Sequence, residues 1–207
     1  MKSTITSELA ELVGILLGDG SISIYTSKKY STYYRVKVTF HKEDKAYLAY
    51  VRGLMNKLLG FQPSVVIRKK ENTSDLILCR KQVVEELLAL GLQKSPKWNR
   101  ARVPLAFMTK DLGKFVLKGY FDTDGSVVIA NNNGIVYPRL EMKICPSPMQ
   151  KQLIELLKLY GFEPGVYALD KHKVRVQMNG KKPLFKWVKE IGFSNPKHAE
   201  KASKFIS

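Results

Sequence analysis

Residues 12–20 read LVGILLGDG, and an altered copy, LKGYFDTDG, occupies residues 117–125. Each copy is largely apolar and ends in Asp-Gly, which places Asp19 and Asp124 at matching positions 105 residues apart. Further landmarks recur in the same order at offsets of 100 or 101: GFQP at 60–63 and GFEP at 161–164, Gly91 and Gly192, Pro96-Lys97 and Pro196-Lys197. Landmarks that recur together at a nearly fixed period indicate a tandem duplication of one structural unit.

Hydrophobic periodicity predicts the same order of elements in both halves. In the first half these are a helix capped by Thr6 or Ser7 and ending at Asp19, strands 21–25 and 34–40, helix 44–59, strands 65–70 and 75–80, and helix 83–90. In the second half they are helix 112–123, strands 126–130 and 136–144, helix 148–160, strands 165–169 and 173–178, and helix 182–191. The predicted fold class is α+β, with two pseudo-symmetric αββαββα halves that share a core.

The segment between the halves has the composition of a linker. It contains two prolines, Pro96 and Pro104, and several basic residues, which suits a connection that lies over the surface. We therefore expect a first repeat at residues 1–95, a linker at 96–110 and a second repeat at 111–207.

The composition points to a polyanionic partner. Lys and Arg outnumber Asp and Glu by 35 to 18, giving a net charge of +17, and the basic residues are spread through the chain. The charge should therefore lie on folded surface, as in proteins that bind nucleic acid. No apolar stretch reaches membrane-spanning length, and residues 1–6 lack the apolar core of a signal peptide. We expect a soluble intracellular protein, in the cytoplasm or an organelle, without a membrane partner.

The two cysteines, Cys79 and Cys145, have no second Cys or His nearby at the spacing of zinc ligands. We interpret both as small buried residues rather than as a disulfide or a metal site.

Small residues repeat at helical spacing within each nonapeptide. Gly14 and Gly18 lie four residues apart, and Gly119 and Thr123 occupy the same places in the second copy. Residues four apart share one helix face, so the two helices could touch through their backbones. Small residues can also simply fit a crowded core, but their duplication together with Asp-Gly favours a contact between the helices.

Parallel packing of these two helices would bring Asp19 and Asp124 together at the carboxyl ends, where both helix dipoles are negative. Two carboxylates at such a place require a cation. Mg²⁺ or Mn²⁺ fits, with the carbonyl groups of Gly18 and Thr123 as further ligands and the rest of the shell open to phosphate. The alternative is that each Asp merely starts a turn with the glycine that follows it.

The paired nonapeptides resemble the signature of the LAGLIDADG homing endonucleases, in the single-chain form that carries two motifs. The resemblance extends over nearly the whole chain, because the order of elements, the motifs and the basic hairpins all agree. It implies two pseudo-symmetric halves packed through the motif helices, each with a four-stranded antiparallel saddle in the DNA major groove. It also implies an intron-encoded nuclease that holds divalent metal between the motif acids and cuts both strands across the minor groove.

Functional residues carry over from the family by position. Four residues match: the metal ligands Asp19 and Asp124, and the helix-contact glycines Gly14 and Gly119. The earlier acid of the motif is present as Asp122 but is replaced by Leu17 in the first copy. Because this position is not the metal ligand in the family, the replacement leaves the expected chemistry intact.

Basic residues near the metal are less regular in the family. Here His41, Lys42 and Lys143, at the ends of the second strand of each half, are the candidates for assisting catalysis. Lysines on a wet strand can equally contact phosphate or form plain surface.

Strand alternation predicts the DNA-binding face. Val36, Val38 and Phe40 should face the core, so their neighbours along the strand face outward. The predicted DNA-binding residues are Ser21, Ser23, Tyr25, Lys28, Lys29, Arg35, Lys37, Thr39, Arg68 and Lys70 in the first half, and Arg139, Glu141, Lys143, Arg175 and Gln177 in the second. Such groups can read bases, although alternation alone also describes a solvated sheet face. Two saddles end to end would span roughly 15 to 18 base pairs, and the target should be asymmetric because the halves differ.

The leading hypothesis is a monomeric, metal-dependent endonuclease that hydrolyses one phosphodiester on each strand of a long asymmetric DNA site, with water activated by the metal. The alternative is a maturase that binds intron RNA, or a non-cleaving DNA-binding protein of the same fold. Two acids beside a polyanion favour the enzyme without excluding a maturase. A structural RNA-binding protein would explain the charge but not the acids.

Overall fold

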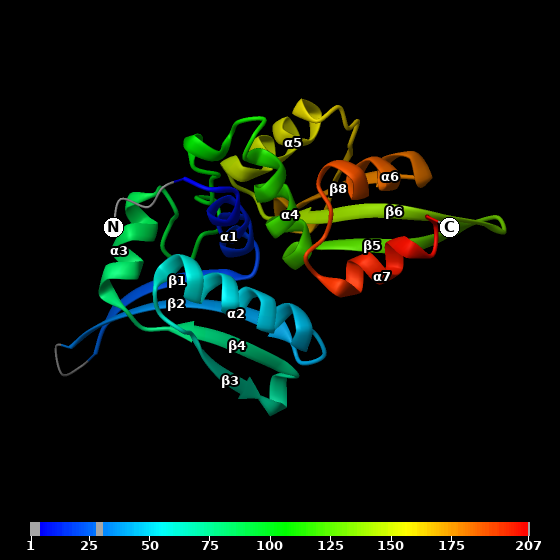
Figure 1. The fold of residues 1–207 in the computed structure, drawn as a ribbon. Helices are drawn as coiled ribbons and strands as arrows, with labels where there is room; N and C mark the ends of the chain where they lie inside the picture. The colour runs from blue at the N-terminus through cyan, green and yellow to red at the C-terminus, as the bar shows by residue number, and fades with distance from the viewer. Residues whose placement is uncertain (1–4, 28–30, 207) are drawn as a thin grey trace.

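The computed structural model describes residues 5–27 and 31–206 (Figure 1). The first half contains α1 (Ser7–Leu17), β1 (Gly20–Thr26), β2 (Thr32–His41), α2 (Lys45–Leu59), β3 (Ser64–Arg68), β4 (Thr73–Leu78) and α3 (Lys81–Ala89). The second half contains α4 (Gly113–Asp124), β5 (Gly125–Asn132), β6 (Ile135–Ile144), α5 (Pro148–Leu159), β7 (Gly165–Ala168), β8 (Val174–Asn179), α6 (Lys181–Glu190) and α7 (Pro196–Ser203). The described residues thus confirm the predicted α+β class, with αββαββα in each half and one additional helix at the end.

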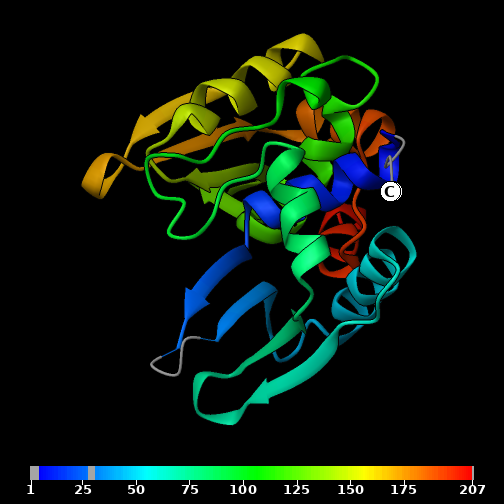
Figure 2. The same ribbon diagram turned by 90° about the vertical axis from the view of Figure 1, so that its left-hand side faces the viewer.

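Each half contributes one four-stranded antiparallel sheet with the same topology. The strand orders are β1-β2-β4-β3 and β5-β6-β8-β7. Gly20 pairs with Val38 in the first sheet, and Gly125 pairs with Met142 in the second, so the motif glycines align the two sheets residue by residue. Figure 2 shows the two sheets on either side of the motif helices, with the remaining helices packed against them.

Local sequence explains where the elements begin and end. The side chain of Thr6 accepts a hydrogen bond from the backbone N–H of Leu9 at 3.1 Å, so Thr6 caps α1. Gly60 ends α2 with φ = 72°, in the left-handed region that favours glycine. On β2, Val36, Val38 and Phe40 are buried against the helices, as their alternation predicts.

The core is organised around a direct contact between α1 and α4. A Cβ atom added to Gly14 would overlap the backbone of α4 at Val116 and lie 3.1 Å from the Cα of Gly119. A Cβ atom on Gly119 would in turn overlap the carbonyl group of Glu11 on α1. Farther along, a Cβ atom on Gly18 would overlap the side chain of Thr123. Because contacts advance in the same direction on both helices, α1 and α4 pack parallel, with their carboxyl ends together.

Several sequence predictions differ from the structure. Lys70 lies in a 3₁₀ turn, Lys69–Glu71, rather than on a strand, because β3 ends at Arg68. The predicted linker does more than cross the surface, since Ala101, Val103 and Phe107 are buried in the core.

Two more corrections concern side-chain exposure and the C-terminal region. Both cysteines are free thiols, but Cys79 is exposed and Cys145 is only half-buried, so the prediction that both are buried is wrong.

Helix α7 was not predicted from the sequence. Lys28 and Lys29 lie outside the described residues. No described helix has both the length and the apolar character needed to cross a membrane.

We predict that Gly14→Ala destabilises the protein by about 1–3 kcal/mol, because the added methyl group must separate two helix backbones. Gly53→Ala is the matched control, because Gly53 is an exposed residue of α2 with open space around it. This change should stabilise the helix by roughly 0.5–1 kcal/mol. Urea unfolding measures both changes. Equal stability of the two variants would contradict the backbone contact.

Candidate functional site

The two motif acids meet at the carboxyl ends of the packed helices. Asp19 follows the C-cap of α1, Gly18, and Asp124 is the last residue of α4. A Cβ atom on Gly18 would lie 3.2 Å from Oδ2 of Asp124, so the backbone of one motif touches the carboxylate of the other. The backbone N–H of Thr39 donates to the carbonyl oxygen of Asp19 at 3.3 Å and fixes the first acid to β2.

A lysine from the segment between the halves completes this site. The ammonium group of Lys97 donates to the carbonyl oxygens of Leu16, Leu17 and Gly18 at 2.7, 2.6 and 2.6 Å. Carbonyl groups at a helix end have no partner within the helix, so Lys97 satisfies them and adds positive charge beside the two acids. Burial lowers the pKa of Lys97 to about 8, while Asp124 and Asp19 oppose that shift.

The acids have raised pKa values. The pKa of Asp124 is raised to about 7, first by burial and then by the carboxylate of Asp19, against the opposing influence of Lys97. Burial also raises the pKa of Asp19, against the influence of Lys97. Both side chains still reach solvent, so water limits the size of these shifts without changing their direction. The site therefore holds more negative charge than one lysine balances, which favours a further cation.

The residues at this site fit a hard divalent ion. In residues 5–27 and 31–206, no three His, Cys, Asp or Glu side chains converge on one point. The protein therefore offers two carboxylates, and carbonyl groups, water and substrate phosphate must supply the other ligands, as is usual for Mg²⁺. Gly18 can contribute only the lone pair of its carbonyl oxygen that Lys97 leaves free.

A small cavity opens beside the acids. It has a volume of about 140 Å³ and is lined by Leu17, Gly18, Lys97, Trp98, Ala101, Tyr120, Asp124, Cys145 and Met149. Both halves and the connecting segment contribute to its wall. Through this cavity the acid of the second half, Asp124, is open to solvent.

The predicted basic helpers, His41, Lys42 and Lys143, make their contacts with groups other than the motif acids. Nζ of Lys42 donates to the side chain of Asn72 at 2.9 Å, and Nδ1 of His41 lies 3.7 Å from Glu43. Lys143 is exposed on β6 opposite Arg175, and its carbonyl oxygen accepts a hydrogen bond from Tyr120 at 3.2 Å. Sequence reasoning missed Lys97, although the repeated Pro-Lys landmark marks it.

Asp122, the earlier acid of the second motif, has a structural role. Its Oδ2 atom accepts a hydrogen bond from the backbone N–H of Ser194 at 2.7 Å, and its carbonyl oxygen accepts one from the side chain of Asn195 at 3.1 Å. Burial raises the pKa of Asp122 to about 7. Asp122 thus fixes the segment that leads into α7.

Apart from Lys70, which lies in the 3₁₀ turn, the predicted DNA-binding residues that the structure describes share the face of each sheet that points away from the core. In the second half, Lys143 pairs in register with Arg175, and Glu141 pairs with Gln177. On this face, Nη2 of Arg139 forms an ion pair with Oε2 of Glu141 at 3.1 Å. The polar atoms there that are buried without a hydrogen-bond partner among the described residues are Nε of Arg139, Oε2 of Glu141, Nε of Arg175 and Oε1 of Gln177. Buried polar atoms normally have partners, so this face is suited to receive polar groups from a ligand.

The outward face of the first half is arranged differently. The rings of Tyr25 and Tyr33 stack with centroids 5.2 Å apart, and the guanidinium group of Arg35 lies 5.7 Å from the ring centroid of Tyr25. Ser21 and Ser23 lie within 3.4 Å of each other on β1. Thr39, Lys37 and Arg68 surround a buried carboxylate at Asp75.

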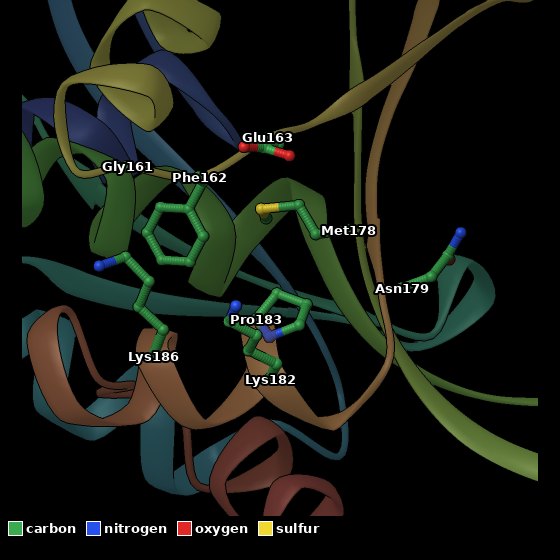
Figure 3. A pocket seen from close by; sticks show the side chains of 8 residues that line it. All are labelled: Gly161, Phe162, Glu163, Met178, Asn179, Lys182, Pro183 and Lys186. Atoms are coloured by element: carbon green, nitrogen blue, oxygen red, sulfur yellow. The ribbon is translucent and has the colours of Figure 1, made fainter.

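A second pocket, of about 270 Å³, lies away from the acids. Figure 3 shows its lining: Gly161, Phe162, Glu163, Met178, Asn179, Lys182, Pro183 and Lys186. Lys186 is occupied by an ion pair with Glu190 at 2.6 Å. No cluster of reactive groups forms there among the described residues, so the acids remain the candidate active site.

Solved structures share this fold. Those of I-DmoI in complex with DNA and Ca, and of the LAGLIDADG meganuclease I-AabMI bound to uncleaved DNA, match with TM-scores of 0.69 and 0.63 at 17% and 12% identity. They cover 97% and 98% of this chain, and the matched regions are 98% and 89% of those chains. A double mutant of I-SmaMI matches with a TM-score of 0.64 at 11% identity, over 97% of this chain and 90% of its own. These neighbours are single-chain LAGLIDADG homing endonucleases, so the predicted resemblance is confirmed at the level of the fold.

Sequence relatives match only part of longer chains. The replication factor C small subunit of Methanocaldococcus jannaschii is 29% identical over 128 residues, and the DNA polymerase of the same organism is 25% identical over 127 residues. These matches cover 61% and 57% of this chain but only 6% and 7% of those proteins. No protein-family model matches the chain.

We predict that Asp124→Asn stabilises the protein at pH 8 in buffer free of divalent metal. The pKa of this carboxyl is raised from 3.8 to about 7, so between these values the folded protein binds more protons than the unfolded chain. The free energy of unfolding therefore falls as pH rises through this range. The unfolding temperature of the variant should be higher than that of the wild type at pH 8, and the two should be equal near pH 4.

The control for this experiment is Glu163→Gln, which removes an exposed acid outside the site. Added Mg²⁺ should raise the unfolding temperature of the wild type but not of Asp124→Asn. A variant that is less stable than the wild type at pH 8 would contradict the raised pKa of Asp124.

Proposed function

We propose that this protein is a site-specific double-strand DNA endonuclease of the LAGLIDADG homing type. The observation that carries the proposal is the meeting of Asp19 and Asp124 at the ends of two helices in backbone contact. Two carboxylates beside a phosphate backbone weaken binding unless a cation joins them, whereas metal-dependent phosphodiester hydrolysis requires such a site. The fold neighbours support the proposal, since structures of I-DmoI contain DNA with Mn, Ca or Mg.

Asp19 and Asp124 would hold the divalent ion, Mg²⁺ or Mn²⁺, with the carbonyl oxygens of Gly18 and Thr123 as further candidate ligands. When bound, the ion activates water and neutralises charge that develops on the phosphate. The fold supplies one acid from each half on either side of its pseudo-two-fold axis. One chain can therefore present equivalent acids to both DNA strands, which favours a monomer that makes one cut in each.

Lys97 is the basic residue best placed to assist the chemistry. Its ammonium group is held beside both acids by three carbonyl oxygens, which take all three of its N–H donors. With a pKa of about 8, Nζ is positively charged at neutral pH, so it would stabilise added negative charge at the site through its charge. His41, Lys42 and Lys143 are better suited to phosphate contacts.

The outward faces of the two sheets would bind the duplex. Their polar residues belong to antiparallel strands whose side chains could enter the major groove, and the excess of positive charge suits the phosphate backbone. The two faces differ at matching positions, with Lys37 in the first half where Glu141 stands in the second. The target is therefore proposed to be asymmetric, with residues 1–95 and 111–207 each reading one half-site and 96–110 joining them.

We predict that the wild type cuts both strands of a defined sequence within a randomised duplex library when Mg²⁺ is present. Asp19→Asn and Asp124→Asn should each lower the cleavage rate by at least about 100-fold, because each removes a charged metal ligand, while retaining DNA binding. Sequencing of the cut ends measures the outcome. Tight selection of a DNA sequence without any cut would move the function to a non-cleaving regulator, and preference for structured RNA would move it to an intron maturase.

We predict that Lys97→Met lowers the single-turnover cleavage rate by about 100-fold, the range of a charge stabiliser, with little change in DNA affinity. Lys197→Met is the matched control, because Lys197 occupies the repeated Pro-Lys position but lies 3.7 Å from Asp44, with its side chain half exposed. Lys197→Met should lower the cleavage rate less than Lys97→Met does. Equal losses in both variants would contradict the special position of Lys97.

A further inference from the structure

A buried carboxylate lies at the centre of the outward face of the first sheet. Asp75 on β4 is fully buried, yet it pairs in register with Thr39 on β2 and Val66 on β3. These positions alternate with the core residues Val38 and Leu76, so Asp75 belongs to the polar layer and not to the core.

Three neighbouring side chains cover this carboxylate. The hydroxyl group of Thr39 donates to Oδ1 at 2.8 Å, and Oδ2 forms ion pairs with Nε of Arg68 at 2.7 Å and Nζ of Lys37 at 3.7 Å, neither of which has the geometry of a hydrogen bond. A carboxylate without solvent contact needs such compensation, because an unpaired buried charge is costly. The side chains of Lys37 and Arg68 are therefore held on the sheet surface by the carboxylate of Asp75 beneath them.

Arg68 is restrained from a second side as well. One of its terminal nitrogens, Nη1, donates to Glu71 at 3.3 Å. Of the five N–H groups of a guanidinium, the one on Nε faces Asp75, and Nη1 faces both oxygens of Glu71. Nη2 has no partner among the described residues and can donate to an acceptor on a base edge, such as those of guanine.

The second half has the opposite charge at the corresponding place. Aligned through the motif glycines, Thr39 and Asp75 correspond to Lys143 and Arg175, which pair in register on β6 and β8. Arg175 lies 5.6 Å from the ring centroid of Tyr167, and its buried Nε has no hydrogen-bond partner among the described residues. At this place the second half thus leaves a cation for an external partner, whereas the first half pairs Lys37 and Arg68 with Asp75.

We propose that Asp75 is a positioning residue that fixes Lys37 and Arg68 and thereby sets the base specificity of the first half-site. This inference rests on the proposed function, because it assumes that the sheet faces read DNA. Asp75 itself contributes a negative charge that weakens attraction to phosphate in general. Its presence at the centre of a basic face therefore favours discrimination between sequences over affinity.

The test compares the wild type with Asp75→Asn. Asparagine keeps the shape and the acceptor for Thr39 but removes the charge that holds the two cations. Duplex selection followed by sequencing gives base preference at each position, and binding to unrelated DNA gives non-specific affinity. Preference at positions within one half-site should fall about fivefold or more, while non-specific affinity at low salt should rise several-fold, because one more positive charge faces the phosphates.

Glu155→Gln is the matched control, because it makes the same charge change at an exposed residue of α5, on the core side of the second sheet. It should leave the base preferences unchanged. If Asp75→Asn does not fold, Arg68→Gln tests the same claim and should lose preference at the same positions.

Each outcome separates this inference from the proposed function. A wild type that selects no DNA sequence would overturn the proposed function and this inference together. A wild type that selects a site, with an unchanged profile in Asp75→Asn, would overturn the inference alone. So would a parallel loss of affinity and preference across the whole site, because that is the behaviour of a merely structural residue.

Discussion

The backbone contact between α1 and α4 is the constraint on which the rest of the structure depends. Helices approach this closely only where side chains are minimal, and Gly14 and Gly119 face each other's backbones with no room for a methyl group. Parallel packing then forces two negative helix ends and two carboxylates into one place. Lys97 compensates part of that charge, and a divalent ion together with DNA phosphate would complete the compensation. The packing of the core and the chemistry of the site are thus one arrangement.

The duplicated halves have diverged at the motif, in the segment that follows each half, and on the sheet faces. Lys97 binds the end of α1, whereas Lys197 lies beside Asp44. Asp75 neutralises the centre of the first sheet face, whereas Arg175 leaves the second face cationic. Asp122 anchors the segment before α7, whereas the first motif has Leu17 in the core at the same place. The two halves thus keep the same order of helices and strands, but the side-chain contacts at these positions differ between them.

Much of this arrangement could be predicted from the sequence, because it depends on local patterns that occur twice. The motif helices, their glycines, the hairpins and the pairing of the acids all follow from periodicity and repetition. Lys97 could not be placed in this way, since its position depends on how the connecting segment folds back onto α1. The contacts of Asp75 depend on strand register, which alternation alone does not specify. Helix α7 was missed because its sequence, PKHAEKAS, has little apolar character.

The central claim is that one metal ion lies between the two motif acids, and iron-mediated cleavage of the polypeptide tests it most directly. Fe²⁺ with ascorbate and peroxide replaces Mg²⁺ and cuts backbone close to the bound ion. The account predicts cuts near residue 19 and near residue 124 in the same preparation, suppressed by excess Mg²⁺ and lost in Asp19→Asn. Cuts near only one of these residues, or cuts that Mg²⁺ does not suppress, would contradict it.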